Sequence, residues 1–410
     1  MRILLLTQWF DPEPTFKGLA FARALAARGH RVEVLTGFPN YPGGKIYDGY
    51  RVRWRQREQI EGIPVTRVAL YPSHDSSSTR RVANYASFAV SAATIGVGSV
   101  STPDVAYVCH PPGTIGLPAI VIQLVRQCPF VYDVLDLWPD SVISSGMMSS
   151  PWLNALLSRW CALVYRRASR VVVPSPGLKR ALVERGVPQE KIEVIYNWCD
   201  EASIGAVTGD ETAAIRYGMK DRFNIVFAGT MGKVQALDAV LEAAALLAPR
   251  LPRVQFVFVG AGVEVPRLKQ MTEDRQLQNV RFLPRQPIDE IGRILTLADV
   301  LLVHLKDDPL FRITIPSKTQ AYMAAGRPIL MGVRGDAAEL TARATCGLSC
   351  EPQDAVSLAA AVEALAVKGR EELRRLGEAG RQFYRDELSL DVGVSKFERV
   401  FRAVAASPRR

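Results

Sequence analysis

Residues 224–229 read Asn-Ile-Val-Phe-Ala-Gly, and a turn through Gly232-Lys233 leads from them into an Ala/Leu-rich helix. The start of the chain repeats this plan, with an apolar strand over 3–6, a polar loop that ends at Gly18, and another Ala/Leu-rich helix. A strand, a glycine-bearing loop and a helix in this order aim backbone N–H groups and a positive helix end at a phosphate or a sugar ring. Two such units half a chain apart predict an α/β fold with two Rossmann-like lobes and a cleft between them.

The length of the chain and the order of its predicted elements indicate two domains. A chain of 410 residues is too long for one ordinary hydrophobic core. Alternating strands and helices predict a first Rossmann-like domain over 1–196 and a second over 223–384. The polar stretch 197–222 is the best candidate for a linker. We expect a final helix of about 385–406 to pack back on the first domain.

The charge of the chain favours an anionic partner. The formal net charge is +10, and residues 1–200 hold 22 basic against 15 acidic residues. This excess in the first half favours a phosphorylated acceptor or an anionic membrane surface. Nucleic acid is not expected as a partner, because no Lys/Arg-rich segment is interleaved with stacking aromatic residues.

Cysteine usage and hydropathy favour a cytoplasmic protein, with contact at the inner face of the cell membrane left open. The six cysteines form no Cys-x-x-Cys pair and only four histidines exist, so neither a disulfide framework nor a zinc site is expected. No segment reaches the roughly 20 apolar residues that span a bilayer, so contact with an anionic membrane would be peripheral. A helix predicted over 79–100 either presents Tyr85 and Phe88 to lipid or packs them in the core.

A helix start near residue 317 carries the most specific pattern in the chain. Pro316 is followed by Ser317 and Lys318, and Gly326 ends the helix before an apolar strand. A helix start with a hydroxyl and an ammonium group suits a diphosphate. The alternative is an ordinary capped helix with Lys318 in solvent.

The turn after residue 228 is a second candidate for phosphate binding. Gly229 and Gly232 let the backbone approach a ligand, and Lys233 can offset anionic charge. The spacing differs from that of a P-loop, and an ordinary strand-to-helix turn is the alternative.

These segments resemble the family 4 glycosyltransferases, enzymes of the GT-B fold, over nearly the whole chain. The matching motifs are Gly18 with Gly29-His30-x-Val-x-Val-Leu-Thr, Asn197-Trp198-x-Asp200 and Tyr322-Met323-Ala324-Ala325-Gly326-Arg327-Pro328. The loop Pro39-Asn40-Tyr41-Pro42-x-Gly44-Lys45 and the segment Asp136-Leu137-Trp138-Pro139-Asp140 resemble the fucosamine-transferase-like branch, which builds bacterial surface polysaccharides.

The resemblance implies a retaining, metal-independent transfer of a sugar, such as an N-acetylated amino or deoxyamino sugar, from a nucleotide diphosphate, commonly UDP. The acceptor would be a lipid-linked glycan, and no cofactor is expected. In this scheme the second domain binds the donor through Gly229, Gly232, Lys233, Ser317, Lys318 and Glu339. The first domain binds the acceptor through Gly18, Asn40 and Tyr41, with His110 and Asp136 as the catalytic candidates.

The chain departs from the family pattern at two places. The Glu-x7-Glu motif of many relatives is replaced by Ile313 and Ala321, while Glu339 matches a later glutamate that meets the ribose. Where many relatives have a histidine after the fifth strand, this chain has Asp136, with Asp133 and Asp140 as rivals for its role.

Two other functions stay open. One is a UDP-sugar 2-epimerase of the GT-B fold, which would need acid and base groups close together. The other is a catalytically inactive partner that binds a sugar nucleotide, which the missing glutamate pair suggests.

Overall fold

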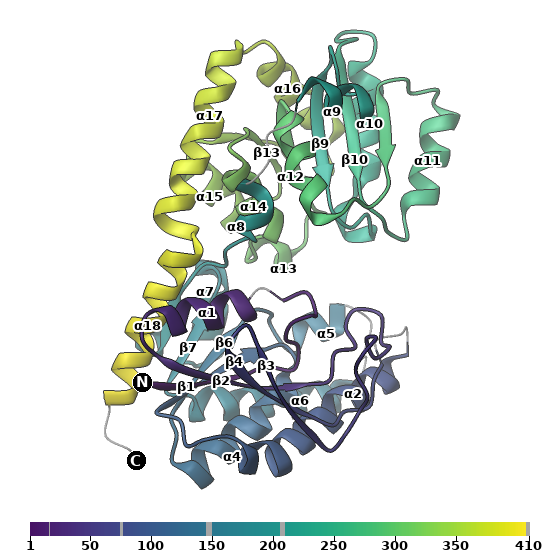
Figure 1. Cartoon of the computed structure of the whole chain (residues 1–410). Helices are drawn as coiled ribbons and strands as arrows, with labels where there is room; N and C mark the ends of the chain where they lie inside the picture. Colours follow the sequence, from purple (N-terminus) through teal and green to yellow (C-terminus); the bar gives the residue numbers. More distant parts are fainter. Residues whose placement is uncertain (16, 74–76, 145–149, 206–209, 407–410) are drawn as a thin grey trace. The chain divides into compact units, whose positions relative to one another are not determined.

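The computed structural model describes the chain except residues 16, 74–76, 145–149, 206–209 and 407–410. It divides into two compact units (Figure 1). Unit 1 comprises Met1–Ile195 with Gly393–Arg410, and unit 2 comprises Tyr196–Val392. The segment 197–222, expected to be a linker, belongs to unit 2. It forms α8 (Glu201–Gly205) and α9 (Glu211–Arg216), and α8 packs on helices of unit 2.

Unit 1 is built on an eight-stranded sheet in the order β3-β4-β2-β1-β5-β6-β7-β8. All neighbouring strands are parallel except β3 and β4, which are antiparallel. The strands are β1 (Arg2–Leu6), β2 (Arg31–Gly37), β3 (Arg55–Ile60), β4 (Ile63–Val68), β5 (Val105–His110), β6 (Phe130–Val134), β7 (Arg170–Val173) and β8 (Ile192–Val194). Chain order reverses between β1 and β5, so the carboxyl ends of these two strands mark the crevice where ligands bind in such sheets.

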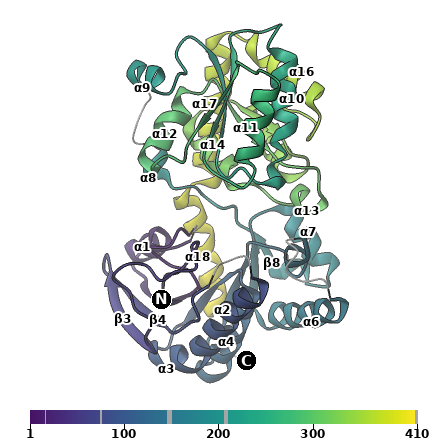
Figure 2. The same cartoon turned by 90° about the vertical axis from the view of Figure 1, so that its right-hand side faces the viewer.

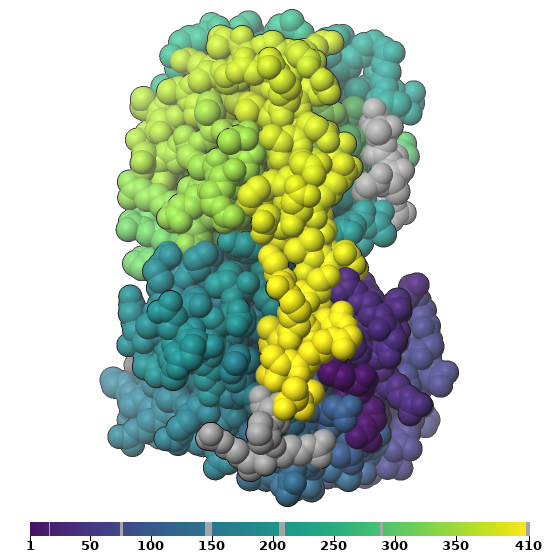
Figure 3. All heavy atoms as spheres, turned by 90° about the vertical axis from the view of Figure 1, so that its left-hand side faces the viewer, coloured from purple at the N-terminus to yellow at the C-terminus, as the bar shows by residue number. Residues whose placement is uncertain are grey.

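Helices cover both faces of this sheet. One face carries α2 (Ser78–Ser91), α4 (Gly116–Arg126) and α6 (Pro151–Arg167), which contact each other in that order. The other carries α1 (Leu19–Ala27) and the end of α18 (Leu390–Ala406), where Phe397 contacts Phe21 and Tyr107 at centroid distances of 5.2 and 5.6 Å. Figure 3 shows α18 lying on the surface of unit 1. The remaining helices are α3 (Val97–Ser99), α5 (Asp140–Ser144) and α7 (Pro176–Glu184).

The helix predicted over 79–100 is interrupted. A π-helical turn over Ala92–Gly96 separates α2 from α3. Tyr85 is 8% exposed and Phe88 is 0% exposed, so both pack in the core and neither faces lipid.

Unit 2 is built on a six-stranded parallel sheet in the order β11-β10-β9-β12-β13-β14. Its strands are β9 (Phe223–Ala228), β10 (Val254–Val259), β11 (Val280–Leu283), β12 (Val300–His304), β13 (Ile329–Gly332) and β14 (Gly347–Ser349). Its helices, besides α8 and α9, are α10 (Leu237–Leu247), α11 (Val265–Asp274), α12 (Ile288–Leu297), α13 (Pro309–Arg312), α14 (Ser317–Ala325), α15 (Asp336–Arg343), α16 (Ala355–Ala366) and α17 (Arg370–Phe383). Chain order reverses between β9 and β12, which places the expected ligand crevice at their carboxyl ends.

Candidate functional site

The carboxyl edge of unit 2 is shaped by glycines. Gly229 follows β9 at φ +140°, a backbone conformation that favours glycine. Its N–H donates to the Val259 carbonyl oxygen at 2.9 Å, and a Cβ added at Gly260 would lie 2.1 Å from the Gly229 carbonyl oxygen. The two loops after β9 and β10 therefore lie backbone to backbone, with no room for a side chain at Gly260.

Lys318 lies beside this turn, in the first turn of α14. Its Nζ sits 3.6 Å from the centroid of the Phe227 ring, and a Cβ added at Gly229 would lie 3.3 Å from Nζ. The amine is buried and has no hydrogen-bond partner among the residues that the structure describes. This burial lowers the pKa of Lys318 to about 7. The structure thus brings Gly229 and Lys318 together and excludes the alternative of a lysine in solvent.

The other side chains predicted from the sequence to bind the donor are exposed. Lys233, Ser317 and Glu339 are exposed, in the turn after Gly232 and in the first turns of α14 and α15. The Gly232 N–H donates a hydrogen bond to the Gln235 Oε1 at 2.8 Å. Their roles toward a donor stay predictions, since no described contact links Lys233 or Glu339 to Lys318.

His304 ends β12 and was not singled out from the sequence. Its Nδ1 lies 2.7 Å from the Gln235 carbonyl oxygen, and its Nε2 accepts the Gln353 N–H at 3.2 Å. This arrangement fixes a neutral ring with the proton on Nδ1, and burial lowers the pKa of His304. The histidine therefore supports the turn that carries Gly232 and Lys233.

The start of α1 in unit 1 is capped by a carboxylate of the same loop. The Leu19 N–H donates to the Asp11 Oδ2 at 2.7 Å, and a Cβ added at Gly18 would lie 2.3 Å from that oxygen. Gly18 is therefore required by the approach of Asp11, and this helix start already holds an anionic group.

The predicted acceptor residues Asn40 and Tyr41 are positioned by hydrogen bonds to Glu13, a residue that no sequence pattern singled out. The Glu13 Oε1 accepts both backbone N–H groups at 2.7 Å, and its Oε2 accepts the Phe10 N–H at 3.2 Å. The Asn40 side chain is buried and bonded to the Phe38 carbonyl oxygen and to Asn84. Tyr41 is half-buried, so its ring is the more accessible of the two side chains.

Glu13 is expected to make the stability of the protein depend on pH. Burial raises the pKa of Glu13 from 4.5 to about 7. The folded state therefore holds the proton more tightly than the unfolded chain. The stabilisation from protonated Glu13 is complete below the pKa of Glu13 in the unfolded chain. It is lost as the pH rises through the pKa of Glu13 in the folded protein, so the free energy of unfolding falls by on the order of 1–3 kcal/mol across this window.

The variant Glu13→Gln should flatten this pH dependence of the free energy of unfolding, measured by urea unfolding between about pH 5 and pH 8. The exposed Glu61→Gln is the control, and equal slopes in all three proteins would contradict the assignment.

The catalytic candidate His110 is buried at the end of β5. It is 1% exposed, its ring contacts Tyr132 and Trp138 at centroid distances of 5.6 and 5.5 Å, and neither ring nitrogen has a described partner. Burial lowers the pKa of His110 to about 3, so the ring is neutral at physiological pH. Its unpartnered nitrogens leave it able to hydrogen-bond a ligand, but not to act as a cationic acid.

The three aspartates that competed for one role have different surroundings. Asp133 is fully buried, 2.5 Å from the Lys17 Nζ and 2.7 Å from the Tyr107 hydroxyl. Asp140 pairs with Arg185. Asp136 has no ion pair among the described residues. Burial raises the pKa of Asp136, although hydrogen bonds from Ser141 and from the Leu137 N–H act in the opposite direction. Asp136 is thus the one of these three carboxylates that is not engaged with a cation.

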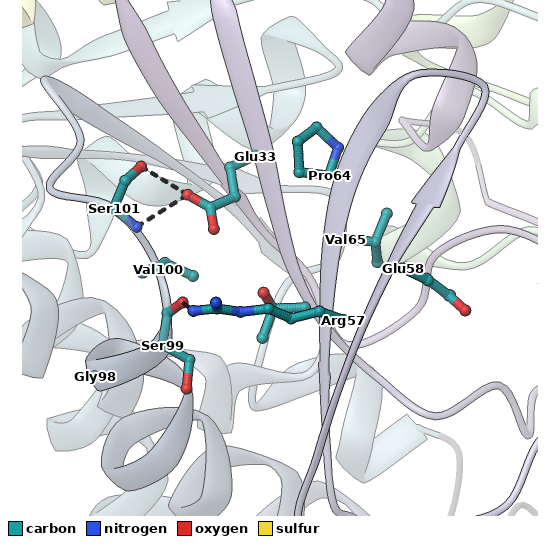
Figure 4. A pocket seen from close by; sticks show the side chains of 10 residues that line it. Glu33, Arg57, Glu58, Pro64, Val65, Gly98, Ser99, Val100 and Ser101 are labelled. Atoms are coloured by element: carbon teal, nitrogen blue, oxygen red, sulfur yellow. Dashed lines mark hydrogen bonds between the residues drawn. The ribbon is translucent and has the colours of Figure 1, made fainter.

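Unit 1 also contains a hollow of about 460 Å³ beside β2 and β4 (Figure 4). Glu33 in its wall accepts hydrogen bonds from the N–H and hydroxyl of Ser101 at 3.0 and 2.7 Å, and Arg57 donates to the Ser99 carbonyl oxygen. The hydrogen bonds of these polar groups are made to other residues of the wall. Glu33 also lies in the middle of β2 and not at its carboxyl end, where ligands bind in such sheets, so we assign the hollow no role. Among the described residues, no group of three or more His, Cys, Asp or Glu could hold a metal ion.

Both halves of the chain match known families. Residues 19–198 match the Glycosyl transferase 4-like domain, and residues 214–383 match the Glycosyl transferases group 1 family. WcaI of Escherichia coli K12, named as a colanic acid biosynthesis glycosyl transferase, is 26% identical over 80% of this chain and 82% of its own length. WbjE of Pseudomonas aeruginosa, named a probable glycosyltransferase, is 25% identical over 67% of this chain and 68% of its own.

Solved structures share the fold at low identity. Anabaena HepE in complex with UDP and glucose superposes with a TM-score of 0.68 at 17% identity and covers 98% of this chain and 99% of that one. A UDP-forming trehalose-phosphate synthase from Burkholderia xenovorans gives a TM-score of 0.72 at 14% identity, with 99% of each chain covered. The predicted GT-B class, with two Rossmann-like units, is confirmed. The chain is a glycosyltransferase that carries a glycosyl transferase 4-like domain followed by a group 1 domain.

Proposed function

We propose that this glycosyltransferase moves a sugar from a nucleotide diphosphate, UDP in the first instance, to a lipid-linked glycan in the assembly of a bacterial surface polysaccharide. The observation that carries the proposal is the buried Lys318 amine, which lies beside Gly229 and has no hydrogen-bond partner among the residues that the structure describes. The colanic acid relative supports the polysaccharide context, and the HepE complexes support UDP. The sugar would be an N-acetylated amino or deoxyamino sugar, as in the fucosamine-transferase-like branch.

Charge on the leaving diphosphate is the main electrostatic problem of this reaction. Lys318 and the N–H groups at the start of α14 would neutralise it without a divalent ion. Retention would follow if the departing phosphate oxygen takes the acceptor proton on the same face of the sugar. Asp136 would then orient the acceptor hydroxyl, and the half-buried ring of Tyr41 would contact the acceptor in the same unit.

The two alternatives lack support from a specific observation. A 2-epimerase needs an acid and a base close together, and the rings of both His110 and His304 are buried and neutral. An inactive partner would bind the nucleotide but turn nothing over.

The test is an incubation of the purified protein with radiolabelled UDP-sugars and a lipid-linked acceptor, with and without EDTA. Transfer of label to the lipid fraction in EDTA is the expected result. Epimerised donor, binding without turnover, or loss of transfer on chelation would each contradict the proposal. Activity at the inner face of the cell membrane is part of the same proposal.

A further inference from the structure

The three helices that cover one face of unit 1 carry no acidic residue. α2, α4 and α6 lie on the same face of the sheet (Figure 2), and their sequences contain neither Asp nor Glu. A helix face that meets water usually carries charges of both signs. In unit 2, α17 shows this pattern, with Glu371 and Arg374 paired at 2.7 Å on its surface.

Each of these helices exposes two large apolar side chains. The exposed ones, each more than half accessible, are Val82 and Val90 on α2, Leu124 and Val125 on α4, and Trp152 and Leu156 on α6. Trp152 and Leu156 are four residues apart and therefore lie on one side of α6. The three helices are neighbours, with α4 in contact with both α2 and α6, so these exposed apolar side chains lie on one face of unit 1.

The same helices also expose arginines. Arg159, Arg166 and Arg167 are exposed on α6, and Arg80 is exposed at the start of α2. No carboxylate pairs with Arg159 or Arg166 among the described residues. This set of residues on α2, α4 and α6 is termed the acid-free face.

The chemistry of the acid-free face selects its partner. A second copy of the chain is disfavoured, because a two-fold contact would bring the same arginines together with no carboxylate to oppose them. Nucleic acid is disfavoured, because Trp152 is the one exposed aromatic side chain on these three helices and the exposed valines and leucines offer bases no stacking surface. An anionic bilayer offers both acidic headgroups and an apolar interior, and tryptophan prefers the boundary between them.

We propose that the acid-free face docks on an anionic lipid bilayer, with Trp152 and Leu156 entering the interface and the arginines at the headgroups. The inference deepens the proposed function, since a lipid-linked acceptor would be presented at that surface. None of the described helices is long and apolar enough to cross a membrane.

The test is co-sedimentation of the full chain with vesicles of phosphatidylcholine that contain about 30 mol% phosphatidylglycerol, or none. The protein should bind the anionic vesicles at about 0.1 M salt, bind pure phosphatidylcholine much more weakly, and be released at about 0.5 M salt. Arg159→Ser with Arg166→Ser should lower the partition constant about 25-fold, at about fivefold for each arginine. Trp152→Ser with Leu156→Ser should lower it at least about tenfold.

Matched variants elsewhere control for exposure and charge. Trp54→Ser removes a tryptophan that is 78% exposed, against 68% for Trp152, and Arg374→Ser with Arg375→Ser removes two arginines from α17. Both control variants should bind the anionic vesicles as tightly as the unmodified chain does. In a second measurement, lipids brominated on the acyl chain should quench tryptophan fluorescence in every protein except the Trp152 variant.

Three results would overturn the inference: no binding to either vesicle, equal binding with and without phosphatidylglycerol, or unchanged binding of both acid-free-face variants. Self-association of the chain that Trp152→Ser abolishes would also overturn it. Vesicle binding needs neither donor nor acceptor. A failure of glycosyl transfer with intact vesicle binding would therefore contradict the proposed function and leave the inference standing.

Discussion

Replacing Lys318 by methionine is expected to lower kcat/KM by about 10²–10³-fold while the protein stays as stable as before. The amine is buried on the Phe227 ring and has no hydrogen-bond partner in the described part of the chain, so it contributes little to folding and its charge is costly to bury. A diphosphate would supply the missing negative charge. Steady-state kinetics and thermal unfolding of the same preparations test this result. A fall in stability that accounts for the lost activity would show that Lys318 is a structural residue.

The pH dependence of UDP binding gives a second readout of the same residue. Burial lowers the pKa of Lys318 to about 7 in the free protein, and a bound diphosphate would raise it. Above pH 7 binding must then take up a proton, so affinity should fall with rising pH, approaching about tenfold per unit. Calorimetry between about pH 7 and pH 8.5 should show this slope, and Lys318→Met should abolish it. The exposed Lys269→Met is the matched control and should keep it.

Replacing Asp133 by asparagine is expected to destabilise the protein by about 3 kcal/mol or more. Lys17 and Asp133 are both buried and lie 2.5 Å apart, and the Tyr107 hydroxyl donates to the same carboxylate oxygen. Without the negative charge, the Lys17 ammonium is buried without its carboxylate. Urea unfolding measures the loss, and Lys17→Met combined with Asp133→Leu should recover much of it.

The control for this prediction is Asp104→Asn, which breaks the exposed pair with Arg2. That loss should stay within about 1 kcal/mol. If Asp133→Asn instead kept its stability and lost all transfer activity, Asp133 rather than Asp136 would be the carboxylate that serves the reaction.

The sequence was sufficient for features that depend on local patterns. Buried parallel strands are continuous apolar runs, which is why β1, β9, β10 and β12 could be located before the structure was known. The positions of Gly229 at a strand end and Lys318 at a helix start could be predicted for the same reason, since each carries a local signal.

Features that depend on distant parts of the chain could not be predicted. Glu13 meets the N–H groups of Asn40 and Tyr41 across 27 and 28 positions, and Lys17 meets Asp133 across 116. Nothing in the neighbourhood of His110 in the sequence indicates that Tyr132 and Trp138 enclose it. The helices within 197–222 were missed because polar composition was read as a linker, although α8 packs in unit 2.

The carboxylate of Asp11 at the start of α1 has a kinetic consequence. A sugar nucleotide that approached unit 1 would meet the Asp11 carboxylate at the helix start that its pyrophosphate would need to occupy. If unit 2 binds the donor, as proposed, unit 1 therefore offers the diphosphate no competing site at this helix start. The rate of transfer should therefore reach a plateau as the donor concentration rises, with no inhibition by excess donor that binds to unit 1.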